Sequence, residues 1–282
     1  MELERRGTGN GSWAIEFQIL GFSEFPELQL PLFTIFTLMF LLAVLGNLVI
    51  IYVVCANQHL HSPMYFFLAN LSALDISSLT VTVPKLLGIL LIDSKGISFS
   101  QCILQMYCFL SLTGVEFLLL TAMAFDRYVA ICHPLRYTMI MSKRVCTLLA
   151  AGSWTAGFLE IMSHAVVISR FSFCDSTVID HIFCDLMALM KLSCSDTSVI
   201  EMMNFAEGGF TAFIPCLLTL TSYGFIISAI LRIRSTAGRR KAFSTCSSHL
   251  MVVIMSYGTM LEKPRDKSSL AKSLRKKIII NQ

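Results

Sequence analysis

The chain has 282 residues, of which 55% are hydrophobic and only 14% are charged, and its formal net charge is +4. Such a composition is typical of a protein embedded in a lipid bilayer rather than of a soluble domain. The positive charge lies in connecting segments and in the C-terminal stretch, so we infer no nucleic-acid partner.

Six apolar windows are long enough to cross a bilayer core, which takes about 20 residues at a rise of about 1.5 Å each. We predict spans at 30–55, 63–91, 102–125, 145–169, 201–231 and 242–261, of which the last is the shortest. The predicted fold is therefore an all-α membrane protein, with an N-terminal segment at 1–29, a transmembrane bundle at 30–261 and a basic tail at 262–282. The first thirty residues lack the apolar core of a cleavable signal peptide, so the first span is expected to serve as an uncleaved insertion signal.

The connecting segments predict the orientation, because lysine and arginine in short loops favour the cytoplasmic side. Two segments are strongly basic: the one after the third span has Arg127, Arg136, Lys143 and Arg144, and the one after the fifth has Arg232, Arg234, Arg239, Arg240 and Lys241. We therefore expect a multi-pass protein of the cell membrane with its N-terminus outside the cell. On that side, Asn10 in the triplet Asn10-Gly11-Ser12 is a candidate glycosylation site.

The ten cysteines divide by predicted depth. Six lie in spans or at cytoplasmic ends and are expected to be small buried residues: Cys55, Cys108, Cys132, Cys146, Cys216 and Cys246. The remaining four, Cys102, Cys174, Cys184 and Cys194, are predicted on the oxidising side, where disulfides form. Four cysteines allow three pairings, and the spacing leaves the choice open. A zinc site built on Cys184 and His181 is a competing interpretation, although its ligand spacing is a poor match.

Residues 123–137 read MAFDRYVAICHPLRY and place Asp126, Arg127 and Tyr128 where an apolar span meets a basic loop. An arginine at the mouth of a helix bundle can be held by the adjacent carboxylate in one state and released to meet a partner in another. The motif therefore points to a membrane signalling receptor. No nucleophile with a neighbouring base and no metal-ligand set stands out, so we expect neither an enzyme nor a cofactor.

Further motifs follow one another along the chain: Gly46-Asn47, LHSPMYFFLANLSALDISSLTVTVPKLL at 60–87, Ser153-Trp154, FCDSTVIDHIFCD at 173–185, Ser222-Tyr223 and KAFSTCSSHL at 241–250. Together with residues 123–137, this set closely resembles vertebrate olfactory receptors, which are rhodopsin-like G-protein-coupled receptors, over roughly residues 10–260. The resemblance implies a rhodopsin-like helix bundle that binds small, volatile, mostly apolar odorants. It also implies signalling through a heterotrimeric G protein of the stimulatory olfactory type to adenylyl cyclase.

The resemblance implies two disulfides, Cys102–Cys184 and Cys174–Cys194. The first would hold the long loop before the fifth span as a lid over a closed, mostly apolar pocket. Helical spacing from Arg127 predicts the third-span residues that face that pocket: Phe109, Leu110, Thr113, Gly114 and Phe117. Matching depth adds Asn204, Glu207, Gly208 and Thr211 in the fifth span, and Tyr257 and Met260 in the sixth. Thr113, Glu207 and Tyr257 are the preferred contacts, because their polar atoms need a partner in a dry site. The apolar positions are more often packing residues.

Ionisable residues inside spans are candidates for function. Asp75 resembles the sodium-binding carboxylate of the wider receptor superfamily, with Asn47 as a nearby partner, and a purely structural polar cluster is the alternative. Glu116 resembles a glutamate common in these receptors at the level of Asp75, whereas Glu160 suggests no function. At the inner ends of the fifth and sixth spans, four residues are expected to influence the switch: Tyr223, Lys241, Ser247 and His249. His249 could equally be a packing histidine.

After Met260 the chain departs from the family pattern, because residues 261–282 contain no apolar window of twenty residues. The seventh span is therefore expected to be missing. Six spans would place the seven basic residues of 263–277 outside, against the positive-inside tendency, whereas incomplete insertion of the sixth segment would keep them in the cytoplasm. One alternative is thus a truncated, signalling-incompetent product retained in the endoplasmic reticulum. A six-span transporter or channel is disfavoured, because the spans show no repeat, ionisable pathway or filter-like segment.

Overall fold

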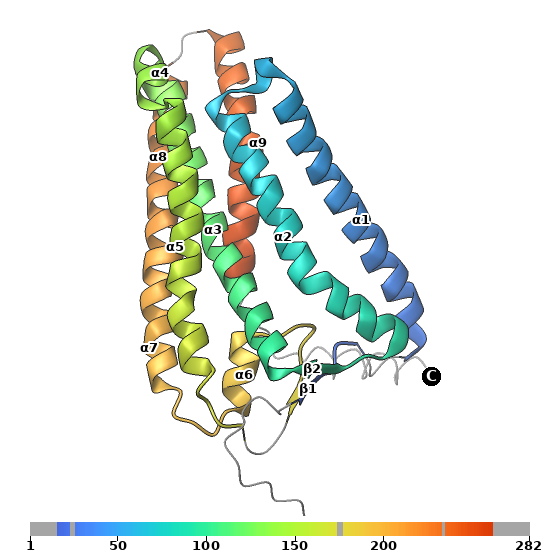
Figure 1. Cartoon of the computed structure of the whole chain (residues 1–282). Helices are drawn as coiled ribbons and strands as arrows, with labels where there is room; N and C mark the ends of the chain where they lie inside the picture. Colours follow the sequence, from blue (N-terminus) through green and yellow to red (C-terminus); the bar gives the residue numbers. More distant parts are fainter. Residues whose placement is uncertain (1–15, 23–25, 174–176, 233–234, 262–282) are drawn as a thin grey trace, which may run out of the picture.

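The computed structural model describes residues 16–22, 26–173, 177–232 and 235–261. Long helices run side by side between a small sheet at one end, called here the sheet end, and the short helix α4 at the other, called the α4 end (Figure 1). The long helices are α1 (Pro26–Ala56), α2 (Pro63–Ile92), α3 (Phe99–Cys132), α5 (Lys143–Ile168), α7 (Ser198–Glu207), α8 (Ile214–Leu231) and α9 (Thr236–Leu261). The short elements are η2 (Gln58–Leu60), η3 (Pro134–Arg136), α4 (Tyr137–Ile140) and α6 (Leu186–Leu192).

Helix α7 continues into α8 through one π-helical segment, η4 (Gly208–Phe213), so that Ser198–Leu231 forms one long apolar stretch. Within the described residues, five stretches are long and apolar enough to cross a membrane: the helices α1, α2, α3 and α5, and this combined stretch. The sixth predicted span also forms a helix, α9, but it begins at Thr236 and includes Arg239, Arg240 and several serines. Because the first half of α9 is polar, this helix is less hydrophobic than the five membrane-spanning stretches.

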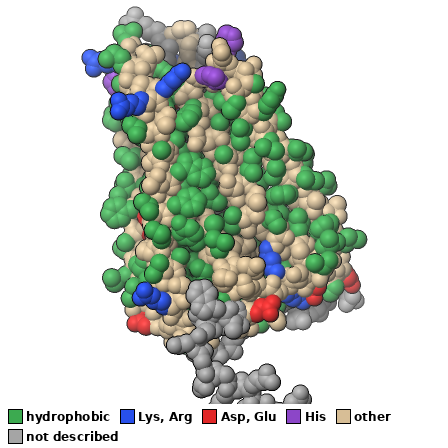
Figure 2. Space-filling model, in the orientation of Figure 1, with side chains coloured by type: hydrophobic (Ala, Val, Ile, Leu, Met, Phe, Trp, Pro, Cys, Tyr) green, Lys and Arg blue, Asp and Glu red, His purple; other side chains and the backbone are tan. Residues whose placement is uncertain are grey.

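The sides of the bundle are apolar, as expected for a surface in contact with lipid. Large hydrophobic side chains such as Leu42, Tyr52, Phe205 and Phe210 are each 70% or more exposed. Figure 2 shows hydrophobic side chains spread over the sides of the molecule, with charged side chains gathered near its two ends. An exposed apolar surface of this extent would be unstable in water, so the arrangement indicates a bilayer environment.

Helix α3 forms the centre of the bundle and packs against α2, α5, α8 and α9. It contacts α5 very closely at Gly157, where an added Cβ would lie 2.6 Å from Cγ2 of Val115 and 2.8 Å from the backbone oxygen of Ser111. Small residues allow helix backbones to approach in this way, which is how helices commonly associate in membranes. Gly157 therefore sets the distance between α3 and α5.

A three-stranded sheet closes the sheet end. Its strand order is β2 (Gly96–Ser98), β1 (Glu16–Ile19) and β3 (Val178–Ile179), with β1 antiparallel to β2 and parallel to β3. Phe17 and Ile19 point into the core while Glu16 and Gln18 are exposed, which is the alternation of a half-buried strand. The N-terminal segment, for which no strand was predicted, thus joins two distant loops into one cap.

Candidate functional site

The cap is tied to α3 by a disulfide between Cys102 and Cys184, whose Cα atoms are 5.4 Å apart. This confirms the first predicted disulfide, and it removes Cys184 from any zinc site with His181. Cys194 is also disulfide-bonded, while Cys174, its predicted partner, lies outside the described residues.

Gln105 strengthens this link, because it is buried one helical turn after Cys102. Its side-chain oxygen accepts a hydrogen bond of 3.0 Å from the Cys184 backbone, and its nitrogen donates one of 2.8 Å to the Val81 backbone oxygen. One side chain therefore connects the loop, α3 and α2. Sequence reasoning missed Gln105, although a glutamine within an apolar span is itself a signal that a hydrogen-bond partner is near.

A cavity of about 170 Å³ lies beneath this cap, between α3, α7 and η4. Its lining consists of Leu110, Thr113, Gly114, Phe117, Asn204, Glu207, Gly208, Thr211 and Ala212. All except Ala212 belong to the predicted ligand-facing set, so the structure brings predicted residues of the third and fifth spans together at one cavity. Their contact with a ligand stays a prediction.

Two polar groups in this cavity differ in what they offer a ligand. The Thr113 hydroxyl donates a hydrogen bond of 2.9 Å to the Phe109 backbone oxygen. The Thr211 hydroxyl is buried and has no hydrogen-bond partner within the described part of the chain. Because a buried hydroxyl without a partner costs free energy, Thr211 is the group best placed to gain from a polar ligand atom.

Two of the other predicted contacts, Phe109 and Tyr257, do not line this cavity. The ring of Phe109 is 4.7 Å from that of Phe183 in the loop, as measured between centroids. The ring of Tyr257, on α9, packs against that of Phe117 at 4.8 Å, so Tyr257 forms a layer next to the cavity wall. The side chain of Met260 lies outside the described residues.

His164 on α5 is a buried residue that sequence reasoning did not select. Its Nε2 atom lies 3.1 Å from Oε2 of Glu207, and its side chain is only 3% exposed. A histidine inside a span is an ionisable residue of the kind that marks a candidate functional position. This contact brings α5 next to the α7 wall of the cavity, although neither ring nitrogen of His164 forms a hydrogen bond with another described residue.

A second polar group lies in the middle of the bundle. Asn47 on α1 is within hydrogen-bonding reach of the Asp75 carboxyl on α2, and Glu116 on α3 is close enough to interact with Asp75 electrostatically. Ser256 on α9 donates a hydrogen bond of 2.7 Å to Glu116. In the described part of the chain, neither carboxyl forms an ion pair with lysine or arginine. Two carboxyls with an amide and a hydroxyl are oxygen donors of the kind that hard cations prefer, so the residues fit the predicted sodium site.

The Asp126 carboxyl at the α4 end is completely buried and has two donors. Arg127 donates to Oδ2 through Nε at 3.0 Å and also through Nη2, and the Tyr137 hydroxyl donates to Oδ1 at 2.7 Å. Burial, together with the hydrogen bond to Asp126, raises the pKa of Tyr137, so its hydroxyl keeps the donated proton. The predicted triplet lies on α3 rather than at the start of a loop, because the helix continues to Cys132.

Two further contacts involve the predicted switch residues. The Tyr223 hydroxyl on α8 lies 2.6 Å from Nδ1 of the buried His249 on α9, so His249 joins these helices through a specific hydrogen bond. The Tyr128 hydroxyl is 3.1 Å from Nε2 of His133. Ser247 donates to the Ser244 backbone oxygen within α9, and the side chain of Lys241 lies outside the described residues.

A bundle of apolar helices, with a loop anchored by a disulfide above a cavity and an Asp-Arg-Tyr motif at the other end, defines a rhodopsin-like membrane receptor. The chain is 46% identical over 267 residues to human (Homo sapiens) olfactory receptor 8D4, covering 94% of the chain and 85% of that relative. It is 47% identical over 251 residues to human olfactory receptor 1J2, with coverages of 89% and 80%. For human olfactory receptor 6F1 the identity is 48% over 252 residues, with coverages of 89% and 82%. Residues 36–271 match the olfactory receptor family, so the chain belongs to it, a family of receptors rather than enzymes.

Proposed function

We propose that this membrane protein binds small odorants in the cavity beneath the cap and signals through a heterotrimeric G protein of the stimulatory olfactory type to adenylyl cyclase. The observation that carries the proposal is that one helix, α3, holds both the cavity wall and the Asp126–Arg127 pair. Thr113 and Arg127 are separated by roughly 21 Å along its axis, at a rise of about 1.5 Å per residue. A displacement of α3 at the cavity would therefore also move Asp126 and Arg127 at the α4 end.

The cavity suggests the class of ligand. Its volume of about 170 Å³ is close to that of an engineered apolar cavity of roughly 150 Å³ that binds benzene. Leu110 and Phe117 supply apolar surface, whereas Thr211 and Glu207 supply polar atoms. We therefore propose compact ligands with an apolar body and one hydrogen-bonding group, such as a hydroxyl or carbonyl.

The contacts at the α4 end correspond to a closed state of the switch, in which Asp126 holds both Arg127 and Tyr137. An agonist would favour a second arrangement in which α9 moves away and Arg127 meets the G protein, and it can do so only through its higher affinity for that arrangement. A groove of about 620 Å³ between α8 and α9 is lined by Ile230, Arg240 and Phe243 among others. This groove supports the docking of a partner at the same end.

The distribution of charge supports the predicted orientation, with the α4 end in the cytoplasm. In the view of Figure 2, basic and histidine side chains lie at the α4 end without acidic ones beside them, while the sheet end carries acidic side chains together with some basic ones. This pattern follows the positive-inside tendency. The proposed glycosylation site, Asn10, lies outside the described residues.

The experiment that tests the proposal measures cyclic AMP in cells that make this chain, with its surface level measured in parallel, during exposure to an odorant panel. We expect at least one compact polar odorant to raise cyclic AMP, and Arg127→Ala to abolish the response at an unchanged surface level. Arg144→Ala, which removes an exposed arginine at the same end, should preserve it. A chain that reaches the surface and responds to no compound would contradict signalling, and retention inside the cell would favour the signalling-incompetent alternative.

A further inference from the structure

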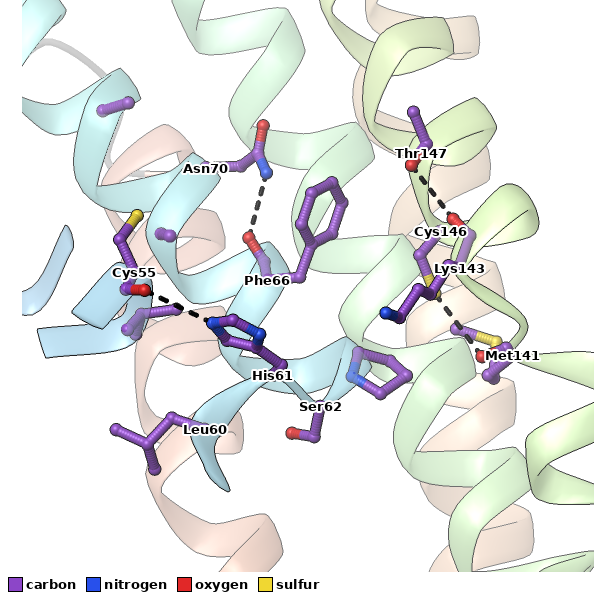
Figure 3. A pocket seen from close by; sticks show the side chains of 14 residues that line it. Cys55, Leu60, His61, Ser62, Phe66, Asn70, Met141, Lys143, Cys146 and Thr147 are labelled. Carbon is purple, nitrogen blue, oxygen red and sulfur yellow. Dashed lines mark hydrogen bonds between the residues drawn. The ribbon is translucent and has the colours of Figure 1, made fainter. Parts of the chain in front are cut away.

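A larger groove, of about 520 Å³, opens at the α4 end between α1, α2 and the start of α5. It shares no lining residue with the odorant cavity and contains none of the switch residues. Figure 3 shows its two sides, with Cys55, His61 and Phe66 on one and Met141, Lys143 and Thr147 on the other. The proposed function leaves this groove without a role.

The mouth of the groove is positively charged. Its lining includes Lys143 and His61 and no carboxylate. In Figure 3 the Lys143 side chain reaches from α5 toward the α2 side. Helices α2 and α5 both begin at this mouth, at Pro63 and Lys143, and helix N-termini add partial positive charge. The mouth therefore favours an anionic group.

The deeper part of the groove is mostly apolar. Val54, Phe66, Ala69 and Ala73 line it, and the two alanines leave room along α2. From Ser62 to Ala73 the helix rises roughly 16 Å, at about 1.5 Å per residue. This length matches one leaflet, since the whole hydrocarbon core is about 30 Å thick. The groove thus combines a cationic mouth at headgroup level with an apolar trough as deep as one leaflet.

From this combination we infer that the groove binds an anionic phospholipid such as phosphatidylserine. Its headgroup meets Lys143, His61 and the Ser62 hydroxyl, and one acyl chain lies along Phe66, Ala69 and Ala73. The assignment to the cytoplasmic leaflet rests on the proposed orientation of the receptor, because anionic lipids concentrate there. The binding itself does not depend on that orientation.

Trp154 provides a local reporter of this lipid. Its indole nitrogen donates a hydrogen bond of 3.2 Å to the side-chain oxygen of the groove residue Asn70. The chain has 2 tryptophans, and the other one is Trp13. In a Trp13→Phe background, fluorescence therefore comes from Trp154, and acyl chains carrying bromine quench it when they lie close.

The test uses the full chain in nanodiscs of phosphatidylcholine that contain the same small fraction of either dibrominated phosphatidylserine or dibrominated phosphatidylcholine. We expect dibrominated phosphatidylserine to quench Trp154 fluorescence more strongly than dibrominated phosphatidylcholine does. The excess should correspond to a local enrichment of about fivefold, which is the factor given by the attraction of one basic residue, about 1 kcal/mol, for an anionic lipid. Both leaflets have the same composition, so the outcome is independent of orientation and of signalling. Equal quenching by the two lipids would overturn the inference.

Matched variants separate the groove from general surface charge. Lys143→Glu should remove the excess quenching, and Lys143→Gln should reduce it. Arg144→Glu makes the same change of charge as Lys143→Glu in the same helical turn, but Arg144 does not line the groove. This variant should therefore keep the excess quenching by phosphatidylserine. Ala69→Phe should block the groove and lower quenching, whereas Ala156→Phe on the exposed side of α5 should not. Equal losses in Lys143→Glu and Arg144→Glu, or competition by soluble glycerophosphoserine, would contradict a phospholipid held in this groove.

Discussion

The Tyr137 hydroxyl donates a hydrogen bond of 2.7 Å to Oδ1 of the completely buried Asp126. Because Arg127 occupies the other carboxyl oxygen, Tyr137 completes the closed arrangement by fixing α4 to α3. The aspartate is thus held from two sides, and only one of its partners belongs to the recognised triplet.

Replacement of Tyr137 by Phe should leave Oδ1 of Asp126 buried without a donor. An unsatisfied buried acceptor costs about 1–3 kcal/mol, so we expect a lower thermal midpoint and a higher basal cyclic AMP level. Tyr52→Phe removes a hydroxyl from a tyrosine that is 72% exposed, and it should change neither quantity. Unchanged basal signalling in Tyr137→Phe, at a reduced midpoint, would limit Tyr137 to a structural role.

Gly157→Ala should disturb the contact between α3 and α5, because the new Cβ would lie 2.6 Å from Val115 Cγ2 and 2.8 Å from a backbone oxygen that cannot move independently. Overpacking of this kind costs about 1–3 kcal/mol. At Gly152 on the same helix, a new Cβ would have no atom within 4 Å, so Gly152→Ala should be neutral or slightly stabilising. Thermal unfolding of the two purified variants measures these effects as changes in the midpoint. Similar midpoints for Gly157→Ala and Gly152→Ala would argue against close packing at Gly157.

The cavity wall could be predicted from the sequence because helical spacing is regular: Leu110, Thr113 and Phe117 share a side of α3 whatever surrounds them. Contacts between helices could not be predicted in this way. His164 meets Glu207, and Tyr137 meets Asp126, through packing that brings separate segments together. The β1 strand was missed for a related reason, because four residues gain a stable partner only when β2 and β3 are adjacent.

Gln105→Met should loosen the cap while preserving the volume of the side chain. It would leave the buried Cys184 backbone nitrogen without its acceptor, a loss that costs about 1–3 kcal/mol, and it would remove the link from Gln105 to the Val81 backbone oxygen. We expect faster proteolysis of the loop before α7 and a lower thermal midpoint. Gln18→Met, at an exposed position of β1, serves as the control and should behave like the unsubstituted chain.

Sodium should stabilise the receptor if Asp75 and Glu116 share a cation. At a concentration ten times its dissociation constant, a bound ion adds about 1.4 kcal/mol, which corresponds to a rise of a few degrees in the thermal midpoint. The comparison is between sodium and choline at equal ionic strength. Asp75→Asn should abolish the difference, whereas Asp93→Asn, at a surface ion pair with Lys95, should retain it. A sodium effect that survives Asp75→Asn would place the ion elsewhere.

Thr211→Val should distinguish polar from purely apolar odorants. Valine keeps the shape of threonine but removes the buried hydroxyl that lacks a partner among the described residues, so a ligand hydroxyl or carbonyl would lose one hydrogen bond, worth about 0.5–1.5 kcal/mol. We expect the half-maximal concentration of a polar odorant to rise by roughly two- to twelvefold, with little change for an apolar analogue of the same size. Thr113→Val should have a smaller effect, because that hydroxyl already donates to the Phe109 backbone. Equal shifts for both odorants in Thr211→Val would mean that the cavity recognises shape alone.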